Sequence, residues 1–303
     1  MRIAFAGTPA PAAAILRHLA EGDHEVALVI TTPEKPRGRR GTRTPTPVGV
    51  TAQELGLPYL PVATINADDV LERLRGEGIG ALVVVAFGQI LKAPVLDGWP
   101  CINVHFSILP AYRGAAPVER ALMDGVNQTG VTIMRMDPGL DTGPIASIAT
   151  TPVDVADDAG AVMDRLCALA GPELDRTLDA IAAGTFTTRP QPEEGATYAA
   201  KITAADRVLT LRSADELVNR VRALSPHIGA TCRIGGEPFK VWRAVPAEPT
   251  GAPEGLQAVD GALVATCADG GAARIEELQP PGKSRMAAGD FLRGWRGGLE
   301  FGE

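Results

Sequence analysis

Asn103, His105 and Ser107 stand at alternate positions in the segment CINVHFSILPAYRG, residues 101–114. Side chains two residues apart lie on the same face of an extended chain, so we expect all three to point to one place. An amide can stabilise an oxyanion, and an imidazole can carry a proton near neutral pH. The spacing therefore predicts a group of catalytic side chains at the end of a strand.

A second polar segment is DPGLDTGPI, residues 137–145, which holds Asp137 and Asp141. Its glycines and prolines indicate a non-repetitive loop. A carboxylate beside the imidazole would hold one tautomer and favour the charged form, and amide, imidazole and carboxylate together are enough for acyl transfer. A histidine near a strand end is usually structural, however, and DPG and DTG are ordinary turn sequences. The residues alone therefore name no reaction.

The elements that must position these groups belong to a first half in which apolar runs alternate with helical patterns. We predict strands at residues 2–6, 25–32, 81–86 and 100–104, and helices at 9–20, 48–55, 67–75 and 115–123. The run ALVVVA at 81–86 is typical of a strand buried on both faces of a parallel sheet. The alternation predicts a doubly wound, Rossmann-like α/β fold with a mostly parallel sheet. Such folds bind ligands beyond the carboxyl ends of their strands.

The second half of the chain has a different composition and a different pattern of apolar residues. The stretch TTRPQPEEGAT at 187–197 has the composition of a linker, and a helix is predicted at 214–224. Short alternating runs at 229–234, 238–244, 256–259, 262–266 and 273–278 predict a small, OB-like β-barrel, followed by a last short helix at 287–293. Because 303 residues exceed what one core usually supports, we predict a catalytic domain at 1–186, a linker at 187–206 and a β-barrel domain at 207–303.

Composition and charge exclude several classes of protein. No apolar run approaches the ~20 residues of a membrane span, and the apolar N-terminal segment is too short for a signal peptide. The cysteines lie far apart without a CxxC pair, so we expect a cytoplasmic protein with reduced thiols and no metal. A GxGxxG motif is absent, which disfavours a dinucleotide site. The net charge of −7 disfavours nucleic-acid binding over the whole surface but allows a local basic site.

Four segments carry a resemblance to a known family: FAGTP at the N-terminus, VVVAFGQIL at 83–91, INVHFSILPAYRGAAP at 102–117 and GLDTGPI at 139–145. Together they resemble the folate-dependent formyltransferases, whose hallmarks are an Asn-x-His pair, a following S-[LI]-L-P and an Asp in a downstream DTG loop. Asn103, His105, residues 107–110 and Asp141 match this pattern. Two departures are APAAAIL, where the family has an acidic and an aromatic residue, and SPHIGA, where a tryptophan is common. Both departures lie away from the proposed catalytic residues. They bear only on details of packing or of the surface that would face the tRNA.

The resemblance implies a reaction and the roles of three residues. The donor would be 10-formyltetrahydrofolate, and the acceptor would be the α-amino group of methionyl initiator tRNA, for translation initiation. Asn103 would stabilise the oxyanion, His105 would move the proton from the amine to the N10 leaving group, and Asp141 would orient His105. We also expect a monomer whose β-barrel contacts tRNA, with no membrane partner.

The resemblance further implies that folate binds beside the end of the 81–86 strand and the turn after the Asn-x-His pair. The expected folate-binding residues are Phe87, Gly88, Gln89, Ile90, Leu91, Ser107, Ile108, Leu109 and Pro110. Core packing explains FGQIL equally well. Three other functions stay open: formyl transfer to an amino sugar or another small amine, hydrolysis of formyltetrahydrofolate, and RNA binding by a barrel on an inactive α/β scaffold.

The segment PEKPRGRRGTRTPTPV, residues 33–48, is the one dense basic cluster of the sequence. It follows the second predicted strand, so it can overhang the carboxyl edge of the sheet. Its prolines and glycines leave no apolar face to bury, which is equally typical of a solvated surface loop. We expect it to bind phosphates of the tRNA acceptor end through Lys35, Arg37, Arg39, Arg40 and Arg43.

Overall fold

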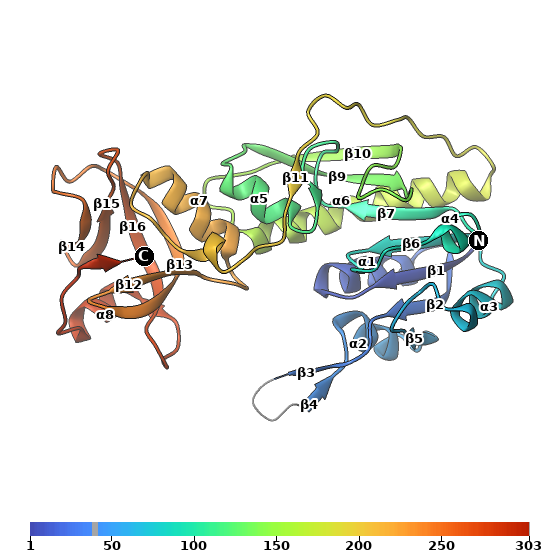
Figure 1. The fold of residues 1–303 in the computed structure, drawn as a ribbon, viewed down its shortest axis with the longest axis horizontal. Coiled ribbons are helices and arrows are strands. Elements are labelled where there is room, and N and C mark those ends of the chain that lie inside the picture. Colours follow the sequence, from blue (N-terminus) through green and yellow to red (C-terminus); the bar gives the residue numbers. More distant parts are fainter. Residues whose placement is uncertain (38–41, 303) are drawn as a thin grey trace. The chain divides into compact units, whose positions relative to one another are not determined.

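The computed structural model describes residues 1–37 and 42–302, which form two compact units (Figure 1). The first unit comprises Met1–Ala115, Gly130–Thr151 and Met163–Tyr198, and the second comprises Ala116–Thr129, Pro152–Val162 and Ala199–Glu303. The chain therefore passes between the units more than once. The domain boundaries drawn from the sequence, with a linker at 187–206, remain a prediction about which pieces fold by themselves.

The described residues of the first unit form a seven-stranded sheet in the order β10-β9-β7-β6-β1-β2-β5. The neighbours from β5 to β7 pair in parallel, and β9 pairs antiparallel with β7. This arrangement confirms the predicted doubly wound, mostly parallel fold. The strands are β1 (Arg2–Gly7), β2 (Glu25–Thr31), β5 (Tyr59–Pro61), β6 (Ala81–Val85), β7 (Cys101–His105), β9 (Gln128–Arg135) and β10 (Ile145–Pro152).

Helices cover both faces of this sheet. Alternate residues of a strand point to opposite faces, and residues of both faces are buried here. Leu28 of β2 and Leu82 of β6 share one core cluster with Leu74 of α3 (Asp68–Gly76). The next residues along the same strands, Val29 and Val83, are fully buried as well, and α1 contacts β1, β2 and β6. The remaining helices up to residue 182 are α1 (Ala10–Glu21), α2 (Pro47–Glu54), α4 (Ala93–Leu96), α5 (Pro117–Met123) and α6 (Ala159–Ala182). No helix within the described ranges is long and apolar enough to cross a membrane.

The basic segment at 33–48 holds two short strands, β3 (Lys35–Arg37) and β4 (Thr42–Thr44), which pair antiparallel. Its carboxyl end is fixed to the sheet by Thr46, which caps α2. Thr46 Oγ1 accepts a hydrogen bond from Gly49 N at 3.0 Å and lies 2.7 Å from Thr31 Oγ1 at the end of β2. Of the five basic residues, Arg39 and Arg40 lie outside the described residues.

The described part of the second unit contains an antiparallel sheet in the order β14-β15-β16-β13-β12-β18, which curls into a nearly closed barrel. This confirms the predicted β-barrel. Its strands are β12 (Ala230–Ile234), β13 (Glu237–Ala247), β14 (Gly255–Val259), β15 (Ala262–Thr266), β16 (Ala272–Gln279), β17 (Met286–Ala287), which pairs with β16, and β18 (Phe301–Gly302).

Helix α7 (Ala214–Leu224) closes the core of the barrel. Ser213 caps its first turn by accepting from Glu216 N, and Leu217, Val221 and Leu224 lie in the same core cluster as the barrel strands. The short elements outside the main sheets are β8 (Arg113–Gly114), β11 (Tyr198–Ala199), the 3₁₀ helix η1 (Ala205–Arg207) and α8 (Ala288–Gly294).

Candidate active site

The predicted catalytic residues of the Asn-x-His pair lie where β7 ends. β7 runs between β6 and β9, and the Asn103 and His105 side chains are almost fully buried, with 8% and 5% of their surfaces exposed. β6 and β7 are parallel neighbours, so their carboxyl ends reach the same edge of the sheet. Ligands bind at this edge in open α/β sheets.

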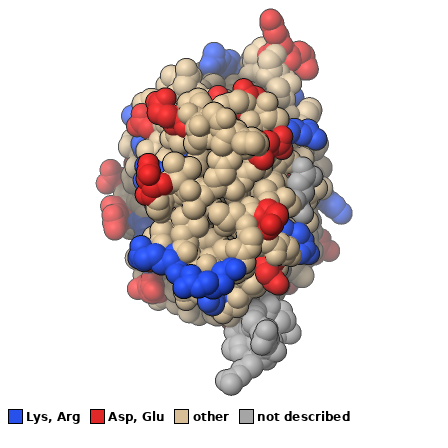
Figure 2. All heavy atoms as spheres, turned by 90° about the vertical axis from the view of Figure 1, so that its left-hand side faces the viewer, with Lys and Arg blue, Asp and Glu red and all other residues tan. Residues whose placement is uncertain are grey.

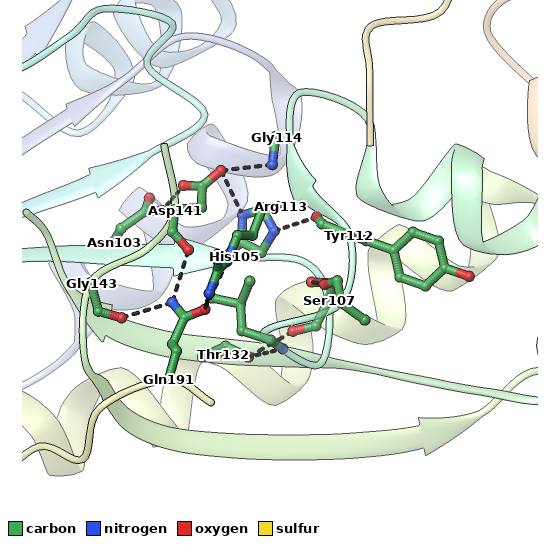
Figure 3. A network of polar contacts seen from close by, with 12 residues as sticks. Asn103, His105, Ser107, Tyr112, Arg113, Gly114, Thr132, Asp141, Gly143 and Gln191 are labelled. Atoms are coloured by element: carbon green, nitrogen blue, oxygen red, sulfur yellow. Dashed lines mark hydrogen bonds and ion pairs between the residues drawn. The ribbon is translucent and has the colours of Figure 1, made fainter. Parts of the chain in front are cut away.

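Asp141 brings the amide and the imidazole together (Figure 3). Asn103 Nδ2 donates to Asp141 Oδ1 at 3.3 Å, and His105 Nδ1 lies 3.7 Å from Oδ2. The backbone N–H of Gly114 donates to the same Oδ2 at 2.8 Å. One carboxylate from a distant loop therefore contacts both side chains that β7 supplies.

The two ring nitrogens of His105 face two acceptors. Nε2 lies 2.9 Å from the carbonyl oxygen of Tyr112, and because a carbonyl only accepts, Nε2 carries a proton and donates it. Nδ1 faces the Asp141 carboxylate at 3.7 Å, which is longer than a hydrogen bond. An imidazolium, with a proton on each nitrogen, suits both acceptors. The carbonyl thus holds Nε2, and Nδ1 is the ring nitrogen that faces the carboxylate.

Ser107 lies beyond β7 and belongs to a turn rather than to the Asp141 cluster. Its Oγ donates to the carbonyl of Ala111 at 2.6 Å, and its own carbonyl accepts from Thr132 Oγ1 at 2.7 Å. Thr132 Oγ1 also accepts from Leu109 N at 3.1 Å. The expected convergence of three side chains thus holds for Asn103 and His105 only. The hydroxyl shapes the turn that follows them.

The predicted folate-binding residues divide by burial. The side chains of Phe87 and Leu91 lie in a core cluster, and Ser107 and Leu109 are buried in their turn. Ile90, in contrast, leaves 79% of its surface exposed, and Gly88 is exposed beside it. Ile108 and Pro110 are half-buried. The exposed residues of this segment are thus Ala86, Gly88 and Ile90.

Backbone strain gathers around this region. Ala86, Tyr112 and Asp141 have φ angles of 44°, 61° and 53°, which are sterically unfavourable for residues with a Cβ. Such residues cost on the order of 1–3 kcal/mol each and persist only where the surroundings hold them. Of the described non-glycine residues with positive φ, Asp260 alone lies elsewhere, in the barrel. The turns that carry the site are thus held against their own backbone preference.

Two contacts of the site come from backbone groups that the sequence could not reveal, the Tyr112 carbonyl and the Gly114 N–H. The other aspartate of the loop, Asp137, does not join the site. Its Oδ1 accepts from Gly139 N and from Thr142 Oγ1 within the same turn. The DPG part of the motif therefore builds the turn, and the DTG part presents a carboxylate.

Burial makes the cysteine thiols poor nucleophiles. All four cysteines are unpaired, and burial raises the pKa of Cys101, Cys167 and Cys232 to about 12, so their thiolates are scarce near neutral pH. Among residues 1–37 and 42–302, no group of three or more His, Cys, Asp or Glu side chains could hold a metal ion.

Comparisons with known proteins agree with this architecture. A family model described as "Formyl transferase" matches residues 1–176, and one described as "Formyl transferase, C-terminal domain" matches residues 201–296. The fold and these matches define a two-domain formyl transferase. A protein of Methylobacterium sp. (strain 4-46) named methionyl-tRNA formyltransferase is 43% identical, over 98% of this chain and 97% of its own. A protein of the same name from Chromohalobacter salexigens is 42% identical over 100% and 98%. The chain belongs to the methionyl-tRNA formyltransferase family.

Solved structures share the fold at low sequence identity. WlaRD, a sugar 3N-formyltransferase studied with dTDP and 5-N-formyl-THF, has a TM-score of 0.69 at 17% identity, covering 94% of this chain and 99% of its own. HypX from Aquifex aeolicus, in complex with tetrahydrofolic acid, has a TM-score of 0.68 at 18% identity, covering 100% of this chain and 50% of HypX. At these identities the likeness concerns the fold alone.

Proposed function

We propose that the protein transfers the formyl group of 10-formyltetrahydrofolate to the α-amino group of methionyl initiator tRNA. The observation that carries this proposal is the convergence of Asn103 and His105 on the Asp141 carboxylate, at the edge of the sheet where ligands bind. In the reaction, the amine nitrogen bonds to the formyl carbon, the bond from that carbon to N10 breaks, and the amine proton ends on N10. The products are N-formylmethionyl-tRNA and tetrahydrofolate.

Stabilising the oxyanion is the role of Asn103. Its amide nitrogen carries two hydrogens, and the bond to Asp141 uses one of them. The second can donate to the oxygen that becomes negative when the amine attacks the formyl carbon. Activation of the amine itself is a smaller task, because the electron-withdrawing aminoacyl ester lowers the pKa of the amine below the ~7.7–8.0 of an ordinary α-amino group.

Proton movement is the role of His105, and Asp141 supports it. The ammonium formed by attack must lose a proton, and the N10 leaving group must gain one. His105 accepts and returns this proton at Nδ1 while its Nε2–H stays bonded to the Tyr112 carbonyl. The nearby Asp141 carboxylate stabilises the imidazolium in between.

Donor binding involves the exposed part of the 86–91 loop. Gly88 and Ile90 present backbone and one apolar side chain at the carboxyl end of β6, where a flat pterin ring can lie. The buried side chains of Phe87, Leu91, Ser107 and Leu109 act on the donor only by fixing this backbone. The amide of Gln89 bonds the backbone of Ile65 and Val62 instead.

The tRNA end of the reaction needs a basic surface. Residues 207–303 carry 12 Lys+Arg and 12 Asp+Glu in the sequence, so the barrel has no overall excess of positive charge. Figure 2 nevertheless shows Lys and Arg side chains gathered in a band on the displayed face, with acidic side chains around it. We assign the acceptor end of the tRNA to the basic segment with Lys35, Arg37, Arg39, Arg40 and Arg43, and part of the remaining backbone to the barrel.

Replacing Arg37, Arg39 and Arg40 by alanine tests this assignment. Each lost phosphate contact removes a salt-dependent contribution from counterion release, so KM for methionyl-tRNA should rise strongly and its dependence on salt should flatten. The KM for the folate should stay within about twofold, since its pocket is built from other residues. Normal use of methionyl-tRNA by the triple variant at moderate salt would remove the basic segment from the interface.

Formyl transfer to an amino sugar is the second candidate, because a sugar formyltransferase shares the fold. The 43% identity to a protein named methionyl-tRNA formyltransferase favours the tRNA. A direct assay decides: 10-formyltetrahydrofolate labelled in the formyl group is offered with methionyl-tRNA, with a sugar nucleotide carrying an amino group, or with water alone. Label on the tRNA supports the proposal, whereas turnover with the sugar or with water only refutes it. We further propose that the enzyme acts in the cytoplasm as a monomer. Light scattering in solution would test the oligomeric state.

A further inference from the structure

We propose that Gln191 is a positioning residue for the reaction, which holds the turn that presents Asp141. Gln191 lies in the segment between α6 and β11, well outside the Asn-x-His and DTG motifs. Its amide bonds that turn on one side and a buried arginine on the other (Figure 3). The proposal rests on the role of Asp141 given above.

The contacts use the whole amide group. Gln191 Nε2 donates to the carbonyls of Asp141 and Gly143, at 2.8 and 2.7 Å. Its Oε1 accepts from Arg113 Nε at 3.0 Å and from Arg113 Nη2 at 2.7 Å. A primary amide has two hydrogens and an oxygen with two lone pairs, so these four bonds fill its capacity.

These partners also fix which way the amide points. A guanidinium only donates, and the two carbonyls only accept, so a flipped amide would place like against like on both sides. Arg113 is 5% exposed, which leaves its guanidinium little freedom to follow another orientation. Two carbonyls that face the same point need a donor with two hydrogens. Glutamine meets this need, and glutamate does not.

The turn that Gln191 holds would not keep its shape unaided. Asp141 has a φ of 53°, and a Cβ built on Gly143 would lie 1.9 Å from the carbonyl oxygen of Arg135, so the turn passes very close to the end of β9. Strained residues of this kind depend on the contacts around them. Because the Gln191 bonds reach the carbonyls of Asp141 and Gly143, they act on the backbone from which the carboxylate projects.

Gln191 is itself held in place by its neighbours in the chain. The backbone of Arg189 and that of Ile145 exchange two hydrogen bonds, at 2.8 and 2.9 Å, at the start of β10. The connecting segment is thus joined to the strand that follows the turn, two residues before Gln191. A shift of the Asp141 carboxylate by ~1 Å can cost about 10²-fold in rate, so this anchoring bears on catalysis rather than on substrate affinity.

The decisive variant is Gln191→Glu in the full-length chain. It keeps the oxygens that Arg113 needs but loses both donors to the turn and sets a negative charge beside two carbonyls. We expect kcat to fall about 10–100-fold. The KM values for the folate and for methionyl-tRNA should change less than about threefold, because Gln191 touches neither substrate in the proposed complex. Gln191→Ala, which removes the amide without adding charge, should lower kcat in the same direction.

A measurement without substrate separates this proposal from the proposed function. The Gly114 N–H donates to Asp141 Oδ2, so its resonance in ¹⁵N-glycine-labelled protein reports the place of the carboxylate. It should shift in both Gln191 variants. The matched control is Gln53→Glu on α2, an exposed glutamine whose Nε2 donates to Tyr59 Oη; kcat and the Gly114 resonance should not change there.

The kinetic and NMR results distinguish a positioning role of Gln191 from a structural role alone. A folded Gln191→Ala or Gln191→Glu variant with the Gly114 resonance and kcat of the parent would overturn the proposal. So would a lower melting temperature and higher KM values with an unchanged kcat, since these mark a structural role alone. A shifted resonance in an enzyme that formylates no methionyl-tRNA would support the positioning and refute the proposed acceptor instead.

Discussion

Two glutamines at the carboxyl edge of the sheet each form side-chain hydrogen bonds to backbone groups, but they connect different segments of the chain. Gln89 accepts from Ile65 N at 2.8 Å and donates to the Val62 carbonyl at 3.3 Å, so it ties its own loop to the segment after β5. Gln191 instead ties the turn of another segment, the one that carries Asp141. In the proposed reaction, the first would fix backbone that meets the donor, and the second would fix a catalytic side chain. Substitutions should therefore act on donor binding at Gln89 and on turnover at Gln191.

Asn103→Ala should give the largest effect, and it sets the scale for both glutamines. Removing one oxyanion donor costs on the order of 10²–10³-fold in rate in other enzymes, and we expect a fall of kcat in that range. The folate affinity and the melting temperature should stay nearly unchanged, because the main partner of the amide is the transition state. Steady-state kinetics, folate titration and thermal melting check this. If folate affinity fell in proportion to kcat, Asn103 would be a binding group instead.

Combining Asp141→Asn with Gln191→Glu tests whether Gln191 acts through Asp141. Asp141→Asn keeps the shape of the side chain and removes its charge, which should lower kcat about 10²-fold. A residue that only positions the carboxylate then has little left to position, so the double variant should lose far less than the product of the two single losses. Fully multiplicative losses in kcat would show that Gln191 influences the reaction by a separate route.

Gln89→Leu should have a smaller effect on a different parameter. Leucine fills a similar volume and removes both bonds to residues 62–65, each worth about 1 kcal/mol. Since Ile90 and Gly88 lie in the same loop, the KM for 10-formyltetrahydrofolate should rise about five- to tenfold. Neither kcat at saturating folate nor the Gly114 resonance should change. A loss of kcat with an unchanged folate KM would erase the distinction between the two glutamines.

The sequence predicted the regular parts of this molecule because local patterns determine them. The apolar run at 81–86 became β6, the strand at 262–266 became β15 with the same bounds, and the helix at 214–224 became α7. Elements with weaker patterns were not predicted. β5 has three residues, and α6 has Pro172 in its interior, which masks a helical pattern. The basic segment was expected as a loop, and its strands β3 and β4 are short.

The candidate site was predictable where side chains carry the chemistry. Asn103, His105 and Asp141 have types and motif positions that indicate acyl transfer, and the structure brings these three together. Backbone partners have no signature in a sequence, and a glutamine in a linker-like stretch resembles any other polar residue. Gln89 and Gln191 illustrate this. The sequence motif predicts that Gln89 binds the folate, whereas no motif predicts a role for Gln191. Long-range contacts decided what each amide does.

The smallest expected effect comes from Asp206 in η1, whose substitution should affect stability and leave catalysis alone. Its carboxylate bonds the Arg120 guanidinium of α5 at 2.7 and 2.9 Å and accepts from Thr203 N and Oγ1. The bond to Arg120 first, and those from Thr203 next, hold the pKa of Asp206 well below its usual range.

The sign of the pH effect follows from that lowered pKa. A carboxyl group whose folded-state pKa lies below its unfolded value contributes stability above the unfolded pKa of about 4, and this is lost as pH falls toward the folded pKa. Asp206→Asn should therefore lower the free energy of unfolding by about 1 kcal/mol at pH 7, and the gap to the parent should narrow below about pH 4. Denaturant titrations between pH 3 and 7 measure this gap. If the gap stayed constant over that range, or if kcat fell as it should in Gln191→Glu, Asp206 would have a role other than anchoring.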